Sequence, residues 1–286
     1  MSTASVTLIY VPYDSGKAGE RCGKAPLRAR AAGISERLRA HATVAEHVVT
    51  ASGSYTTEGA TAFDLARSIS RAVADARRAG SFPLVLAGDC VSSLGAWSGM
   101  GGERPAVLWL DAHGDYNTAD TSETGFLGGM PVAMLTGDTF KAATALVPGY
   151  RPLAKERLIF LGVRDLDPCE AERIAEDRIP AYSAIALRTQ RADMLTAVDR
   201  IGTASDAVYL HLDMDVLDPE PVAYSDYAVP DGIRSDEIGP LLDDLAARCS
   251  LQAATITAFD PALDRGGLTM ERYVALIVQV ARLGRR

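Results

Sequence analysis

The sequence predicts an α/β fold with three layers, α/β/α, in which helices cover both faces of a mostly parallel sheet. Short apolar runs rich in β-branched residues alternate along the chain with longer segments of helical periodicity, and this alternation is typical of β-α-β units. The runs contain few polar side chains, as expected of strands that are covered on both faces. The runs are residues 6–10, 83–86, 107–110, 158–161, 208–212 and 253–257.

One helix is predicted between the first two of these runs. Apolar residues recur there at helical spacing, and the pattern stops before Gly80, a residue type that commonly ends helices. The recurring residues are Ala62, Leu65, Ala66, Ile69, Val73 and Ala76. Residues 116–130 and 219–234 are instead long and irregular, and such loops commonly carry function. Each begins soon after an acidic strand end, at the sheet edge where ligands bind in parallel sheets.

The composition favours one domain, spanning residues 1–286. A chain of 286 residues with 48% hydrophobic content can bury a single large core, and no repeat or linker divides it. The net charge of −8 argues against nucleic acid and anionic membranes as partners, because such binding depends on Lys and Arg. We therefore expect a small-molecule partner.

The N-terminal residues 1–5 do not resemble a targeting signal, and no apolar run is long enough to cross a bilayer. A cytoplasmic location is the resulting expectation. The four cysteines lie far apart in a chain too large to depend on disulfides, so they are predicted to be reduced thiols that serve as packing residues or ligands. They are Cys22, Cys90, Cys169 and Cys249.

Two acidic clusters follow apolar runs. Asp111, His113 and Asp115 occupy alternate positions after one run, and Asp213 and Asp215 end another. In extended backbone, alternate side chains share one face. Four carboxylates that converge at one sheet edge repel one another unless cations neutralise them. Solvated acids at loop starts are the alternative, but two such clusters together favour a site for hard divalent metals, Mn²⁺ before Zn²⁺.

Three blocks resemble the signatures of the arginase/agmatinase (ureohydrolase) family. They read Asp-Ala-His-Gly-Asp-Tyr-Asn from residue 111, Gly-Val-Arg-Asp-Leu-Asp-Pro from residue 162 and His-Leu-Asp-Met-Asp-Val-Leu-Asp-Pro from residue 211. Their order and spacing match the family, and the resemblance covers about the whole chain. It implies a three-layer α/β/α fold and a centre of two Mn²⁺ ions.

The resemblance also implies a role for each ligand. Asp111 and Asp213 would bridge the two metals, while Asp115 and position 90 would complete one metal site. The other site would be completed by His113 and Asp215.

Position 90 is the first departure from the family pattern. The family has a His in a Gly-Gly-Asp-His block, and this chain has Ala-Gly-Asp-Cys at residues 87–90. The thiolate of Cys90 can bind a divalent metal, although a small buried Cys that only packs is the alternative. A thiolate ligand would add one negative charge, so bound water should be less acidic than in arginase.

Two further departures concern the family's proton shuttle and its guanidinium contact. Gly128 stands in a Gly-Gly-Met-Pro block where the family has a shuttle His. Ala258 stands where the family has a Glu that contacts the guanidinium, in a less secure alignment of residues 257–261. We expect that Asp260 could partly replace that Glu.

The positions that resemble the family's amino-acid recognition set are present. Asn117 and Thr124 would bind an α-carboxylate, and Asp167 would bind an α-ammonium. In the alternative interpretation, Asn117 and Thr124 only stabilise a loop and Asp167 only begins a helix before Pro168. Retained tail contacts beside a lost shuttle favour a substrate with an altered head group.

The sequence therefore predicts a manganese-dependent amidinohydrolase. Two metals would supply the nucleophile and stabilise the tetrahedral intermediate, and Asp115 would hold and relay a proton. An N-hydroxyguanidine needs less help with protonation because its hydroxyl makes it less basic. The Cys90 and Gly128 departures resemble the amidinohydrolases of cycloserine biosynthesis, so the preferred reaction converts Nω-hydroxy-L-arginine to hydroxyurea and L-ornithine.

Two alternatives remain open at this point. The first is another ureohydrolase activity, on arginine, agmatine, a guanidino acid or a formimino amino acid. The second is a metal-binding scaffold without catalysis. His211 could support a ligand, although a strand His is more often a packed core residue, and His41 and His47 are predicted at the surface. The family includes trimers and hexamers, so a homo-oligomer also stays open; residues 282–286 offer no obvious assembly element.

Overall fold

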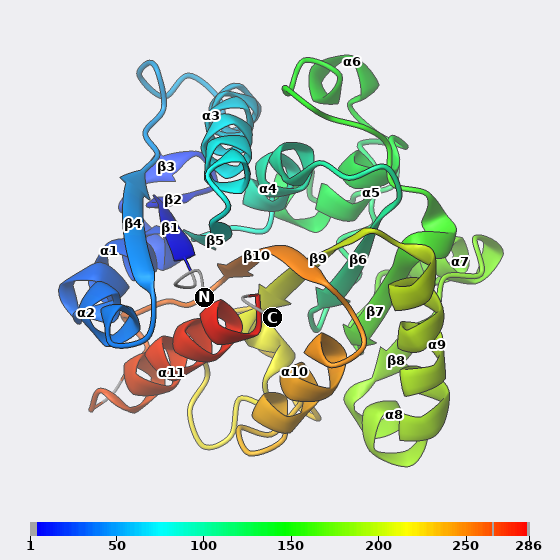
Figure 1. Ribbon diagram of the computed structural model, residues 1–286. Helices are drawn as coiled ribbons and strands as arrows, with labels where there is room; N and C mark the ends of the chain where they lie inside the picture. Colours follow the sequence, from blue (N-terminus) through cyan, green and yellow to red (C-terminus); the bar gives the residue numbers. More distant parts are fainter. Residues whose placement is uncertain (1–4, 265, 285–286) are drawn as a thin grey trace.

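The computed structural model describes residues 5–264 and 266–284, and an eight-stranded sheet forms its centre (Figure 1). The strand order is β4-β1-β5-β10-β9-β6-β7-β8, and each neighbouring pair is parallel. The strands are β1 (Ser5–Val11), β4 (Thr43–Val48), β5 (Phe82–Ala87), β6 (Pro105–Leu110), β7 (Leu158–Gly162), β8 (Ala181–Ser183), β9 (Ala207–Asp213) and β10 (Leu251–Thr257). A separate antiparallel pair consists of β2 (Tyr13–Asp14) and β3 (Lys17–Ala18).

Helices cover both faces of the sheet. One face packs against α3 (Glu58–Arg78), α4 (Ser92–Met100), α5 (Pro131–Thr136) and α7 (Pro168–Glu176). The other packs against α1 (Ala25–Ala31), α2 (Ile34–Arg39), α8 (Ala184–Thr189), α9 (Arg191–Ala204), α10 (Ile238–Ala246) and α11 (Leu268–Leu283). The remaining short elements are α6 (Lys141–Thr144) and the 3-10 turns η1 (Arg21–Lys24), η2 (Leu127–Gly129), η3 (Lys155–Arg157) and η4 (Met214–Val216). The predicted three-layer α/β/α architecture is confirmed.

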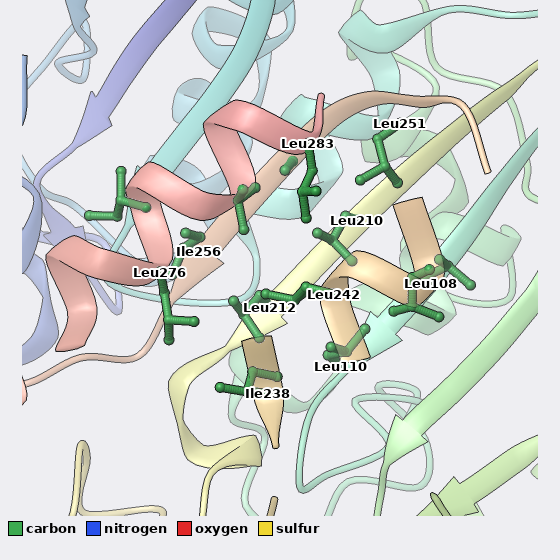
Figure 2. Packing of buried hydrophobic residues seen from close by; sticks show 14 of the residues in the cluster. Leu108, Leu110, Leu210, Leu212, Ile238, Leu242, Leu251, Ile256, Leu276 and Leu283 are labelled. Carbon is green, nitrogen blue, oxygen red and sulfur yellow. The ribbon is translucent and has the colours of Figure 1, made fainter. Parts of the chain in front are cut away.

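Two apolar cores lie on opposite faces of the sheet because side chains alternate along each strand. In β6, Leu108 and Leu110 belong to the core beneath α10 and α11, while Val107 and Trp109 belong to the core beneath α3 and α4. Figure 2 shows the first core, in which leucines of β6 and β9 meet Leu242 of α10. Both faces of the sheet are covered by apolar side chains, which explains the nearly continuous apolar runs in the sequence.

All six predicted strands are present, and the predicted helix is α3, which ends two residues before Gly80. The short pair β2 and β3 was not predicted, and two strands of the large sheet were also missed, both at its edges. β4 alternates exposed and half-buried residues, and β8 has only three residues, so neither carries the apolar run of a central strand. Residues 219–234 contain no helix or strand, and residues 116–130 contain only η2.

No helix among the described residues is both long and apolar enough to cross a membrane. Residues 1–4 and 285–286, which bear on the predictions for the two chain ends, lie outside the described residues. His41 and His47 are exposed, as predicted. The four cysteines are free thiols, also as predicted.

Replacing Leu210 with Ala should lower the free energy of unfolding by about 2–5 kcal/mol, because it opens a cavity in the core. Leu210 is 0% exposed at the centre of β9. Urea denaturation followed by circular dichroism measures the change. The matched control is Leu146→Ala, whose side chain is 69% exposed and whose loss should change stability by less than about 0.5 kcal/mol. Equal effects of the two substitutions would contradict the assigned core.

Candidate metal centre

Four neighbouring strands, β5, β10, β9 and β6, end at one edge of the sheet and deliver the acidic cluster there. The register pairs Trp109 of β6 with His211 of β9. It also pairs Asp213 with Thr257 of β10. Asp111 and Asp213 each follow this pair by two residues, so their side chains emerge on the same face of the sheet. The parallel register is therefore the reason that acids about 100 positions apart in sequence converge.

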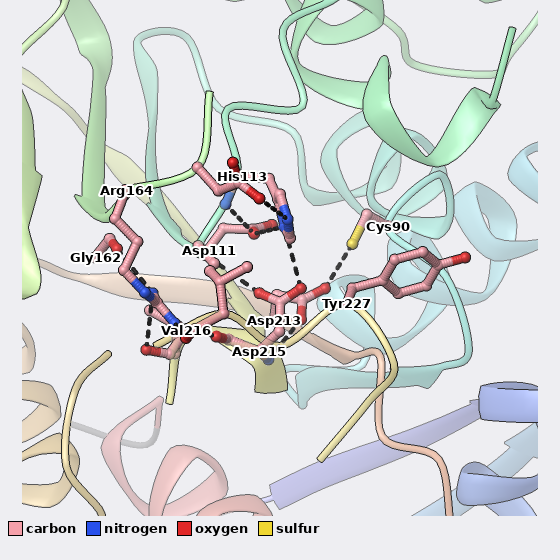
Figure 3. A network of polar contacts seen from close by, with 12 residues as sticks. Cys90, Asp111, His113, Gly162, Arg164, Asp213, Asp215, Val216 and Tyr227 are labelled. Atoms are coloured by element: carbon pink, nitrogen blue, oxygen red, sulfur yellow. Dashed lines mark hydrogen bonds and ion pairs between the residues drawn. The ribbon is translucent and has the colours of Figure 1, made fainter. Parts of the chain in front are cut away.

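The side chains of this cluster lie within contact distance of one another (Figure 3). The Cys90 thiol donates to Asp213 Oδ2 at 2.8 Å. The Nδ1 atom of His113 lies 3.2 Å from Asp215 Oδ2 and 3.4 Å from Asp111 Oδ1. Apart from His113, which is partly exposed, these residues are buried.

The backbone does not bring the ligands together in the way that the alternating pattern predicted. β6 ends at Leu110, and Asp115 has a left-handed φ of 47°, so Asp111, His113 and Asp115 do not share one extended strand. Asp215 likewise lies in the 3-10 turn η4. The residues converge because each loop folds back over the sheet edge. The predicted convergence was right, and its proposed backbone geometry was wrong.

Backbone donors hold the carboxylates in place. Asp111 Oδ1 accepts from His113 N at 2.7 Å, and Asp213 Oδ1 accepts from Asp215 N at 2.8 Å. The backbone N–H of Ala112 donates to Asp215 Oδ1 at 3.2 Å. These backbone donors therefore fix the orientation of the three carboxylates.

Burial raises the pKa of every carboxyl group in the cluster, because the charged form loses its hydration. The pKa of Asp213 rises to about 8, by desolvation first and by the charge of Asp215 second. The pKa values of Asp111 and Asp115 are also raised, by desolvation and then by a neighbouring carboxylate. Burial lowers the pKa of His113, but hydrogen bonds to Asp111 and Asp215 outweigh it and raise that pKa to about 12. The cluster thus has an excess of negative charge that only cations or protons can offset.

The donor set fits a pair of divalent cations. One group of mutually close donor atoms is Cys90, Asp111, Asp115 and His211, and the other is Asp111, His113 and Asp215. The groups share Asp111, one of the two acids predicted to bridge the metals; Asp213, the other, belongs to neither group, and His211 stands in the first. Asp115 Oδ2 is buried without a hydrogen-bond partner, a costly condition that a cation would remove. The cysteine and carboxylate donors suit borderline and hard dications.

The Cys90 thiol belongs to this centre rather than to the apolar packing alone. Desolvation, followed by the charges of Asp213, Asp115 and Asp111, raises its pKa well above the ordinary value. Without cations Cys90 is therefore a neutral thiol that donates to a carboxylate. Nearby cations stabilise the thiolate form.

A polar layer lies directly beneath the cluster. The rings of His211 and Trp109 stack with centroids 3.6 Å apart, and Trp109 Nε1 donates to Asp111 Oδ2 at 3.2 Å. The Thr257 hydroxyl donates to Asp213 Oδ2 at 3.1 Å and lies 3.5 Å from His211 Nε2. Desolvation lowers the pKa of His211 to about 3, so this imidazole is neutral. Both interpretations of His211 hold, because it is a packed core residue that also adjoins the ligands.

Arg164 organises the centre from outside, a role that the sequence motif alone did not reveal. Its guanidinium donates to a ring of carbonyl oxygens, among them Asp215 O at 2.9 Å, Gly162 O at 3.0 Å and Val229 O at 2.8 Å. These bonds fasten η4 and the loop at residues 219–234 to the end of β7 (Figure 3). Five N–H donors in one plane are needed for such a ring, and among side chains only Arg has them.

Asn117 and Asp167 are in direct contact. Asn117 Nδ2 donates to Asp167 Oδ2 at 2.8 Å, and Thr121 Oγ1 donates to Asn117 Oδ1 at 2.9 Å. Asp167 precedes α7 as its N-cap residue. Thr124 is exposed, and its hydroxyl accepts from Phe126 N at 3.2 Å. All three predicted recognition residues line the same cavity as the acidic cluster.

This cavity has a volume of about 200 Å³ and joins the acidic cluster to the Asn117–Asp167 pair. Gly128 and Ala258 line it, so neither an imidazole nor a carboxylate enters from those two positions. Among the described residues that line the cavity, Asp260 is absent; its Oδ1 accepts from Ala262 N at 2.8 Å. The expectation that Asp260 could partly replace the missing Glu is therefore not supported, because its carboxylate caps the turn through Pro261 and Ala262 and does not line the cavity.

Several further residues that line the cavity were not predicted as site residues. Among them, Asp14 lies in β2 and Asp89 follows the end of β5, while Phe126 and Tyr227 come from the two long loops. Asp89 Oδ2 accepts from Ser15 N at 2.9 Å. Asp89 belongs to the Ala-Gly-Asp-Cys block and Phe126 adjoins the Gly-Gly block, so both lay beside a motif that the sequence analysis had singled out.

An eight-stranded parallel sheet covered by helices on both faces, with an acidic, cysteine-containing cluster at its carboxyl edge, defines an α/β protein with a candidate metal centre. The family model described as the arginase family matches residues 4–282. The chain belongs to the arginase family.

Named relatives agree with this assignment. The chain is 31% identical over 299 residues to the arginase of Bacillus caldovelox, covering 95% of this chain and 96% of that protein. It is 35% identical over 218 residues to the arginase of Brevibacillus brevis, covering 74% and 72%. The solved structure of the Bacillus caldovelox arginase superposes with a TM-score of 0.86 at 28% identity, with 99% of each chain covered.

The stability of the metal-free protein should fall as pH rises from about 5 to about 8. The folded-state pKa of Asp213, about 8, lies above its ordinary value of 3.8. Ionisation therefore costs the folded state more than the unfolded chain, and the penalty grows until pH passes that folded pKa. Added Mn²⁺ should reverse the trend, because metal binding requires deprotonated ligands.

Thermal unfolding midpoints at pH 5.5 and 8, with a chelator or with Mn²⁺, measure this dependence. The Asp213→Asn variant is the control, since its amide cannot ionise and should flatten the metal-free trend. A metal-free protein that is more stable at pH 8 than at pH 5.5 would show that the cluster is not strained by its own charge.

Proposed function

We propose that this arginase-family hydrolase is a manganese-dependent amidinohydrolase whose preferred substrate is Nω-hydroxy-L-arginine, cleaved with water to hydroxyurea and L-ornithine. The observation that carries the proposal is a combination of residues within one cavity. Side chains suited to hold two cations and the Asn117–Asp167 pair line it, while Gly128 and Ala258 offer no proton carrier and no carboxylate to a head group.

The absence of a His at residue 128 and of a Glu at residue 258 favours a substrate head group of low basicity. An arginine guanidinium is cationic near neutral pH, and a Glu is well suited to bind it. The electron-withdrawing hydroxyl of an N-hydroxyguanidine lowers the basicity of that group, so a neutral and more electrophilic form is available. A neutral head group does not need the carboxylate that Ala258 lacks.

The residues of the chain divide the remaining work. Two Mn²⁺ ions, held by Cys90, Asp111, His113, Asp115, Asp213 and Asp215, would make water nucleophilic near neutral pH and stabilise developing negative charge. Asp115, the carboxylate with an unpartnered oxygen, would accept the proton of the attacking water and return it to the leaving amine.

The tail of the substrate would lie against the second half of the cavity. The amide of Asn117 and the hydroxyl of Thr124 would donate to the α-carboxylate, and Asp167 would accept from the α-ammonium. The Asn117–Asp167 hydrogen bond holds both groups in place before substrate arrives. This arrangement positions the head group over the acidic cluster.

Two alternatives are kept for the test. Another ureohydrolase substrate, such as arginine, agmatine, a guanidino acid or a formimino amino acid, would use the same centre. A scaffold without catalysis is disfavoured, because a buried cluster with raised carboxyl pKa values destabilises the fold and a scaffold has no use for it.

With Mn²⁺ bound, the protein should release L-ornithine from Nω-hydroxy-L-arginine and at least about 100-fold less from L-arginine, as expected when a required polar contact is missing. Chromatographic assay of ornithine, with hydroxyurea and urea measured in parallel, gives both rates. Faster release from L-arginine would assign an ordinary arginase activity. Release from neither, with two metals bound, would favour another amidine or the scaffold.

Cys90→Ser should abolish a sulfur-to-metal absorption band in protein loaded with Co²⁺, because only a thiolate ligand gives that transition. Near-ultraviolet absorption during Co²⁺ titration measures the band. Cys249→Ser is the matched control, since Cys249 is also buried but hydrogen-bonds to Val198 O, away from the cluster. A band that persists in Cys90→Ser would exclude Cys90 as a ligand.

A further inference from the structure

The space beside Gly128 is filled by an aromatic ring. A Cβ atom at residue 128 would lie 2.3 Å from Phe126 Cζ and 2.4 Å from Phe126 Cε1. Both distances are far below van der Waals contact. The backbone of Gly128 is outside the left-handed region, so a side chain here would require the ring to move, whereas the backbone conformation does not oppose it.

Phe126 is held in this position from two sides. Its ring stacks on Tyr227 with centroids 5.8 Å apart and an interplanar angle of 22°. The Arg21 guanidinium lies over the Tyr227 ring, 5.0 Å from its centroid. The Phe126 backbone donates to Thr124 Oγ1 and accepts from Gly129 N. Three distant segments of the chain therefore fix one ring.

The ring gives the space at position 128 an apolar filling. Phe126 stacks on Tyr227, and a Cβ at residue 128 would also lie 3.2 Å from Phe126 Cε2, so it would sit over the rim of the ring and not in line with its edge. The ring carries neither a net charge nor a hydrogen-bonding group. A guanidinium cation beside it would lose hydration without gaining a counter-charge, whereas a neutral head group would lose less.

We propose that Phe126, braced by Tyr227 and Arg21, is a specificity-determining residue that fills the place of a side chain at position 128 and favours a neutral N-hydroxyguanidine over a guanidinium cation. Phe126, Gly128 and Tyr227 all line the cavity above the acidic cluster. The inference rests on the proposed function for the identity of the head group. The steric part of the proposal, in which the Phe126 ring fills the space of a side chain at residue 128, is independent of any substrate.

The steric part is tested by thermal unfolding of four metal-loaded proteins: wild type, Gly128→Ala, Phe126→Ala and the double variant. Gly128→Ala should lower the midpoint by about 3 °C or more, because the methyl group must displace the ring. In the Phe126→Ala background the same change should cost less than about 1 °C. Equal shifts in both backgrounds would overturn the steric part of the proposal.

Gly129→Ala is the matched control for this cycle. A Cβ at Gly129 would meet nothing within 4 Å, and its backbone also lies outside the left-handed region. The midpoint should therefore be unchanged whether or not Phe126 is present. A loss as large as that of Gly128→Ala would show that any side chain in this turn is harmful and would overturn the specific role of Phe126.

The specificity part is tested by the ratio of kcat/KM for Nω-hydroxy-L-arginine to that for L-arginine. Phe126→Ala should lower the ratio by about tenfold or more. Phe126→Ala/Gly128→His should gain arginine cleavage relative to Gly128→His, which keeps the obstructing ring. An unchanged ratio in Phe126→Ala would overturn the specificity role even where the stability cycle behaves as expected.

Failure of the proposed function is recognised separately. If the wild type cleaves neither substrate, the binding of both compounds to the metal-loaded wild type and Phe126→Ala proteins is compared by calorimetry. A preference for the hydroxylated compound that falls in Phe126→Ala supports the role of the ring. An equal preference in both proteins overturns it.

Discussion

The repulsion among buried carboxylates at the carboxyl edge of the sheet is the constraint on which the rest of the centre depends. Asp111, Asp115, Asp213 and Asp215 lose hydration and face one another, and burial and mutual charge raise their pKa values. A fold accepts such a cluster only where another interaction offsets its cost. Divalent cations provide that interaction, so the centre is tied to metal binding by its own electrostatics.

The surrounding structure limits how the cluster can relax. Backbone N–H groups fix one oxygen of several acids, while Trp109 and Thr257 hold others from the layer below. Arg164 ties the carbonyl groups of the following turns together from outside. These contacts preorganise the ligands, because each side chain has little freedom left to lose on binding.

The character of the head-group site follows from small residues and an aromatic wall. Gly128 and Ala258 remove charge from the cavity, and Phe126 occupies the volume that Gly128 leaves. Asn117 and Asp167 are retained at the other end of the cavity. Under the proposed function, the protein would combine a metal centre and a tail site of the arginase type with a head-group site of different chemistry.

The sequence by itself determined the central strands, the long helix and the acids that converge at the edge of the sheet. Strands covered on both faces are continuous apolar runs, and acids placed directly after them have few roles other than binding. It missed the edge strands β4 and β8, whose side chains are partly exposed, and it placed Asp115 on an extended strand that the chain does not form. It also suggested that Asp260 could partly replace the Glu that contacts the guanidinium, whereas the Asp260 carboxylate accepts from Ala262 N instead.

Only the tertiary structure decided what surrounds the ligands. The contacts of Arg164, the stacked pair of Trp109 and His211, and the ring of Phe126 over Gly128 join residues from distant segments. Local sequence periodicity carries no information about such pairs, because their distance depends on strand register and on the path of long loops. The sequence therefore reveals which groups can perform the chemistry, and the packing of the loops decides which head group they meet.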